Sequence, residues 1–102
     1  MDFKALGARL GLDEQDFMEL VELFVTTTIA DIEKIKTSLA EASPADAAAA
    51  SHSIKGAAGN LGFEAIADLA LDMEMGAKSG SLDSFESWVA DLESQVLALT
   101  SS

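Results

Sequence analysis

The stretch Ser51-His52-Ser53-Ile54-Lys55-Gly56-Ala57-Ala58-Gly59-Asn60-Leu61-Gly62 holds the chain's single histidine and three of its seven glycines. On a helical wheel of about 100° per residue, the apolar side chains around it gather on the side opposite His52. These apolar residues are Ala47, Ala50, Ile54, Ala57, Ala58 and Leu61. The stretch therefore predicts an amphipathic helix with one core-facing stripe and an outward-facing His52.

Helix signals continue on both sides of this stretch. Asp13 is suited to cap a helix N-terminus, Ser43 before Pro44 starts the central helix, and Gly11, Gly62 and Gly80 stop helices. The five predicted helices cover residues 2–10, 13–41, 43–61, 63–77 and 82–99. The second is expected to bury Phe17, Leu20, Val21, Phe24, Thr28, Ile32, Ile35 and Leu39, and the fifth to bury Leu82, Phe85, Val89, Leu92, Val96 and Leu99.

Four long amphipathic helices with short connections favour an all-α fold. We expect an antiparallel up-down four-helix bundle with a short additional N-terminal helix, in which every apolar stripe is buried. With 102 residues, 49% of them hydrophobic, the chain fits a single domain spanning residues 1–102.

Composition excludes several classes of function. The formal net charge of −12 would repel nucleic acids and anionic membranes, and no segment of the sequence reads as a signal peptide or a membrane span. No cysteine and one histidine leave no thiolate or multi-histidine site, so no metal is expected. We expect a cytoplasmic protein.

The face around His52 is made of small residues. Ala48 and Ala49 lie one turn before it, Gly56 one turn after, and Gly59 two turns after. Each glycine within a helix costs about 0.5–1 kcal/mol relative to alanine, so both weaken the helix. This face is predicted to leave room for the surface of a partner protein.

Lys55 is predicted to lie on the same face as His52. It is the one cation between Lys36 and Lys78 in an acidic chain. Neutral imidazole is nucleophilic near its reference pKa of about 6.5, and a lysine beside it would attract phosphoryl oxygens. Together the two residues suggest that His52 accepts a phosphoryl group.

These residues resemble the signature of the histidine-containing phosphotransfer (HPt) family of two-component phosphorelays. The signature runs here as His52-Ser53-Ile54-Lys55-Gly56, with Gly62 ahead of the next helix. The resemblance implies that His52 is phosphorylated on a ring nitrogen and that Lys55 neutralises the phosphoryl oxygens. Glu74 matches a position where the family often has glutamate or glutamine near the phosphorylation site.

The resemblance also implies partners. The chain would accept phosphoryl from the aspartate of a receiver domain, whose Mg²⁺ belongs to the receiver, and pass it to another receiver. Response-regulator receivers and a hybrid sensor histidine kinase are the implied partners. Because the sequence has no nucleotide-binding motif, we expect a carrier without kinase activity or a cofactor of its own. We also expect a monomer.

Three other interpretations stay open at the level of sequence. The first is an acidic helical adaptor with an HPt-like fold that is never phosphorylated. The second is a histidine-dependent hydrolase that uses His52 with Glu74. The third is the phosphotransfer module of a larger kinase, although a chain that starts at Met1 and ends after the last apolar repeat suits a free-standing protein.

Overall fold

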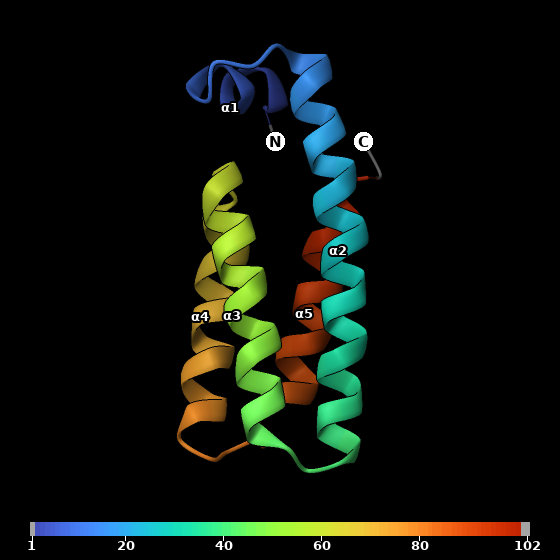
Figure 1. The fold of residues 1–102 in the computed structure, drawn as a ribbon, viewed down its shortest axis with the longest axis vertical. Coiled ribbons are helices and arrows are strands. Elements are labelled where there is room, and N and C mark those ends of the chain that lie inside the picture. The colour runs from blue at the N-terminus through green and yellow to red at the C-terminus, as the bar shows by residue number, and fades with distance from the viewer. Residues whose placement is uncertain (1, 101–102) are drawn as a thin grey trace.

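The computed structural model describes residues 2–100, and all regular structure in that range is helical. The elements are α1 (Phe3–Arg9), α2 (Glu14–Ala40), α3 (Pro44–Leu61), α4 (Glu64–Lys78) and α5 (Phe85–Ala98). Figure 1 shows α2 to α5 lying along the long axis and α1 lying across one end. The predicted all-α class is confirmed.

The helix ends follow the signals in the sequence. Asp13 caps α2, because its Oδ1 accepts a hydrogen bond from the backbone N–H of Asp16 at 2.8 Å. Gly62 ends α3 with a left-handed φ of 83°, which glycine adopts without strain. Ser43 stands at the N-cap of α3 as predicted, but its hydroxyl donates to Asp46 at 3.0 Å instead of capping the helix backbone.

The four long helices pack in a closed order. α2 contacts α3 and α5, α3 contacts α4, α4 contacts α5, and α1 packs on α2. Each long helix therefore buries its apolar stripe between two neighbours. Among the most fully buried large side chains are Phe17, Ile35, Ile54, Phe63, Met73, Phe85 and Leu92.

An aromatic cluster joins α1 to the end of the bundle. The ring centroid of Phe3 lies 5.9 Å from that of Phe17 and 6.4 Å from that of Phe63. Gly7 allows the close approach, because a Cβ there would lie 2.9 Å from the Cβ of Phe17. The short helix is thus fixed against α2.

Two details of the predicted packing are wrong. Leu20 was expected in the core but is 37% exposed. Leu82 was expected to open the last helix. That helix begins at Phe85, and Leu82 packs against the core from the preceding connection.

Candidate functional site

His52 lies near the middle of α3 with its side chain 65% exposed. Its neighbours Ser51 and Ile54 are fully buried on the inner side of the same helix. Successive helical residues differ by about 100°, so burial of these two directs His52 outward. The predicted outward orientation of the histidine is confirmed.

A buried carboxylate from α4 lies against the imidazole. The Glu74 side chain is only 4% exposed, and its Oε2 lies 2.8 Å from Nδ1 of His52. Its Oε1 accepts a hydrogen bond from Nζ of Lys55 at 2.7 Å, and Nζ of Lys78 lies 3.2 Å from Oε2. Two ammonium groups and a ring nitrogen thus compensate the cost of burying this charge.

These contacts fix the ionisation of Glu74. The hydrogen bond from Lys55 is the main cause that lowers its pKa from 4.5 to about 2, and Lys78 and His52 add to it. Burial acts in the opposite direction but is outweighed. At neutral pH the group is therefore a carboxylate.

An ionised carboxylate determines the tautomer of the neutral imidazole. It carries no proton and can only accept hydrogen bonds, so Nδ1 of His52 must be the donor in their 2.8 Å contact. The proton of neutral imidazole is then on Nδ1, and Nε2 keeps its lone pair. The exposed ring thus has its nucleophilic nitrogen on Nε2.

The glycines after His52 border open space. A Cβ added at Gly56 or at Gly59 would meet no atom within 4 Å, and both residues are exposed. Ala49 is exposed as well. The predicted small-residue face is therefore present at these three positions.

Ala48 is the exception, because it is buried in the hydrophobic core. It lies two turns before Lys55 on one side of α3, and Lys55 reaches Glu74 of α4. This side of the helix is therefore turned towards α4, which covers Ala48. The prediction that Ala48 forms part of an exposed docking face is wrong.

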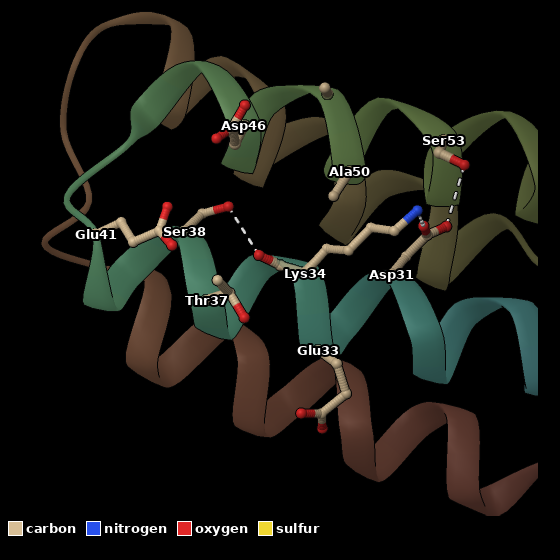
Figure 2. Close-up of a pocket in the computed structure, with 10 residues that line it drawn as sticks. Asp31, Glu33, Lys34, Thr37, Ser38, Glu41, Asp46, Ala50 and Ser53 are labelled. Carbon is tan, nitrogen blue, oxygen red and sulfur yellow. Dashed lines mark hydrogen bonds and ion pairs between the residues drawn. The ribbon is translucent and has the colours of Figure 1, made fainter.

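On its other side, α3 meets α2 along a groove of about 530 Å³ that includes Asp31, Lys34, Ala49 and Ser53 (Figure 2). The hydroxyl of Ser53 donates to Oδ2 of buried Asp31 at 3.1 Å, and Nζ of Lys34 lies 3.8 Å from Oδ1. The Asp31 carboxylate is thus satisfied within the protein. We interpret it as a link between α2 and α3.

The part of the chain that the structure describes contains neither a cluster of metal-ligating side chains nor a membrane-spanning helix. Between residues 2 and 100, no three His, Cys, Asp or Glu side chains gather in a way that could hold a metal ion. In the same range, no helix combines the length and apolarity needed to cross a membrane.

A family model described as "Hpt domain" matches residues 19–102. The chain belongs to the Hpt domain family. Hpt domains transfer phosphoryl groups in two-component phosphorelays, as carriers without intrinsic catalytic activity that work with receiver domains and histidine kinases. Histidine phosphotransfer within a phosphorelay is therefore the general function of this Hpt domain. No curated protein and no solved structure gives a significant match to the chain.

Lys78 is the residue of this Hpt domain that sequence reasoning missed. It follows Glu74 by four residues on α4, a spacing that brings two side chains together on one helix face. That spacing was a usable signal once Glu74 had been singled out. The third partner of the carboxylate could thus have been predicted from the sequence.

Proposed function

We propose that His52 accepts a phosphoryl group on Nε2 from the aspartyl phosphate of one receiver domain and passes it to the aspartate of another. The observation that carries this proposal is the 2.8 Å contact between Nδ1 and buried Glu74. It occupies one ring nitrogen and leaves the other free on an exposed side chain. Glu74 is a supporting residue, because it acts through the imidazole.

In the accepting step, the Nε2 lone pair forms the N–P bond while the P–O bond to the receiver aspartate breaks and its electron pair stays on the leaving carboxylate. The proton on Nδ1 stays in place, and Glu74 stabilises the positive charge that develops on the ring. Transfer onward reverses these bond changes on a second receiver. Mg²⁺ is supplied by the receiver, and this chain contributes no cofactor.

Lys55 supplies positive charge beside the transferred group in this proposal. Its ammonium group lies 2.7 Å from Oε1 of Glu74, and the side chain is partly exposed. An ammonium group has three N–H donors on a flexible stem, so it can turn towards phosphoryl oxygens next to the ring. We therefore propose Lys55 as the residue that neutralises part of the phosphoryl charge.

The receiver is proposed to dock over the open part of α3. Ala49, Gly56 and Gly59 allow a close approach to His52, since no side chain stands above them. On α2, Leu23 is 62% exposed and Leu20 is also exposed, and we propose that these two leucines add apolar contact area. These residues are the proposed docking surface.

The proposal includes an antiparallel up-down arrangement of α2 to α5, supported by their short connections and by the closed order of helix contacts. It also includes a monomeric protein in the cytoplasm. A hybrid sensor histidine kinase and response regulators carry the partner receivers.

Incubation with a phosphorylated receiver tests the proposed function. We expect an acid-labile, alkali-stable label on the wild-type protein and none on His52→Gln, since glutamine cannot form the phosphoramidate. Circular dichroism checks that the variant keeps its helices. An unlabelled wild-type protein, tested against a panel of receivers, would refute phosphotransfer and favour a non-phosphorylated adaptor.

A further inference from the structure

Glu74 is held by two lysines that come from different helices. Lys55 reaches it from α3 and contacts Oε1 at 2.7 Å, whereas Lys78 reaches it from α4 and contacts Oε2 at 3.2 Å. Oε2 is also the oxygen that accepts the Nδ1 proton of His52. One carboxylate thus has one lysine on each oxygen, and only Lys78 shares its oxygen with the imidazole.

The proposed phosphotransfer makes two demands on Lys55. In the unphosphorylated protein it holds Glu74, on the Nδ1 side of the ring. A phosphoryl group on Nε2 would extend from the other ring nitrogen, away from Glu74, and would bring about two negative charges. A lysine that turns towards that group weakens its bond to Oε1.

The Glu74 carboxylate needs a cationic partner to stay buried against Nδ1 of His52. An ionised carboxyl group that loses its partners does not remain 96% buried at low cost, and a side chain as long as glutamate can turn out to water instead. Release of Glu74 would free Nδ1 from its acceptor. The imidazole would then lose the contact that keeps its proton on Nδ1.

We propose that Lys78 is a positioning residue that holds Glu74 on Nδ1 of His52 while Lys55 turns to the phosphoryl group. This inference rests on the proposed phosphotransfer to His52. Lys78 is 67% exposed, lies one turn from Glu74 on the same helix, and does not depend on α3 for its place. It can therefore keep its bond to Oε2 when the side chains of α3 rearrange.

The consequence lies mainly in transfer out of the phosphorylated protein. In that step the N–P bond breaks, its electron pair returns to Nε2, and the phosphoryl group bonds to the receiver carboxylate. A proton held on Nδ1 makes the ring a better leaving group. Lys78 should thus affect the rate of this step and leave receiver binding unchanged.

Nuclear magnetic resonance of the His52 side chain in ¹⁵N-labelled protein tests the inference, with Lys78→Met as the variant. In the unphosphorylated state we expect this variant to keep the wild-type Nδ1–H signal, because Lys55 still holds Glu74. After phosphorylation by a receiver, the signal should persist in wild type and in Lys78→Arg. It should be lost to exchange with water in Lys78→Met. A persistent Nδ1–H signal in phosphorylated Lys78→Met would overturn the inference.

Transfer kinetics give a second measurement on the same proteins. Loss of this exposed ion pair should slow transfer from phosphorylated His52 to a receiver by about two- to fivefold, with rescue by Lys78→Arg. Lys36→Met serves as the control, because it removes the same charge from an exposed ion pair between Lys36 on α2 and Glu93 on α5. It should leave the transfer rate unchanged. A wild-type rate in Lys78→Met would contradict the inference.

The unphosphorylated double variant Lys55→Met/Lys78→Met separates this inference from the proposed function. With both lysines absent, Glu74 should leave Nδ1, and the neutral tautomers should shift towards Nε2–H. An unchanged tautomer ratio would show that the lysines do not hold the carboxylate. A wild-type protein that accepts no label refutes phosphotransfer. The tautomer ratio in the double variant still decides whether Lys55 and Lys78 together hold Glu74 on Nδ1 of His52.

Discussion

Two buried carboxylates, Asp31 on α2 and Glu74 on α4, contact consecutive residues of α3 with different results. Asp31 accepts from the hydroxyl of Ser53 at 3.1 Å, and its lysine lies 3.8 Å away. Glu74 contacts the His52 imidazole at 2.8 Å and two lysines at 2.7 and 3.2 Å. A carboxylate bonded to a hydroxyl group links two helices, whereas one bonded to an imidazole also sets which nitrogen can react.

Of the two carboxylates, Glu74 should have the larger effect on the rate of phosphoryl transfer when it is substituted. Glu74→Ala removes the acceptor of the Nδ1 proton and frees both lysines. We expect phosphoryl transfer to slow by roughly ten- to hundredfold, as for the loss of a hydrogen bond to a charged group worth about 1.5–3 kcal/mol. Rapid-quench measurements with a phosphorylated receiver check the rate. A rate within twofold of wild type would contradict the role of Glu74.

The pH dependence of stability should separate Glu74 from a neutral residue at the same position. Its folded-state pKa of about 2 lies below the ordinary value of 4.5, so the native state favours the carboxylate. This contribution is fully present above the ordinary pKa and is lost as the pH falls from 4.5 towards 2. Urea unfolding of wild type and Glu74→Gln should show their difference in free energy shrinking over that range. A constant difference would rule out this linkage.

Substitution of Asp31 should affect stability and leave chemistry intact. Asp31→Ala removes the bond to Ser53 and should lower the free energy of unfolding by about 0.5–1.5 kcal/mol. Urea titration measures the loss. The transfer rate of the folded variant should stay within about twofold of wild type, because no contact of His52 is removed. A large rate loss at unchanged stability would show that Asp31 also serves the reaction.

The smallest effect should come from the small-residue face of α3, at Gly59. Gly59→Ala should raise the free energy of unfolding by about 0.5–1 kcal/mol, since its Cβ meets no atom and alanine is the better helix former. Gly59→Leu should instead weaken receiver binding, measured by titration calorimetry, because its side chain fills the space proposed for the partner. Wild-type affinity in Gly59→Leu would leave the glycine without a docking role.

The sequence predicted the helices well because their signals are local. The 3.6-residue period, the Asp13 cap and the left-handed Gly62 all act within a few residues of the chain. Leu20 was misassigned because its burial depends on how the neighbouring helices pack against α2. That information is not contained in the pattern of α2 alone.

The site was predicted only in part for a related reason. A helical wheel shows that His52 points outward, but not which side of α3 the next helix covers. Ala48 was therefore misassigned. The wheel also cannot show that Glu74 of α4 contacts Nδ1 of His52. The family resemblance placed Glu74 near the histidine, but this contact and the one to Lys55 depend on the register between α3 and α4, whereas the contact of Lys78 with Glu74 lies within α4.

The bonds of Ser53 and His52 have a further consequence for the geometry of α3. Ser53 is joined to α2 and His52 to α4, so two adjacent residues are bonded to helices on two different sides. Rotation of α3 about its own axis would break at least one of these short contacts. The orientation of the His52 imidazole about the helix axis is thereby fixed. Every receiver that docks on this face would therefore encounter Nε2 in the same orientation.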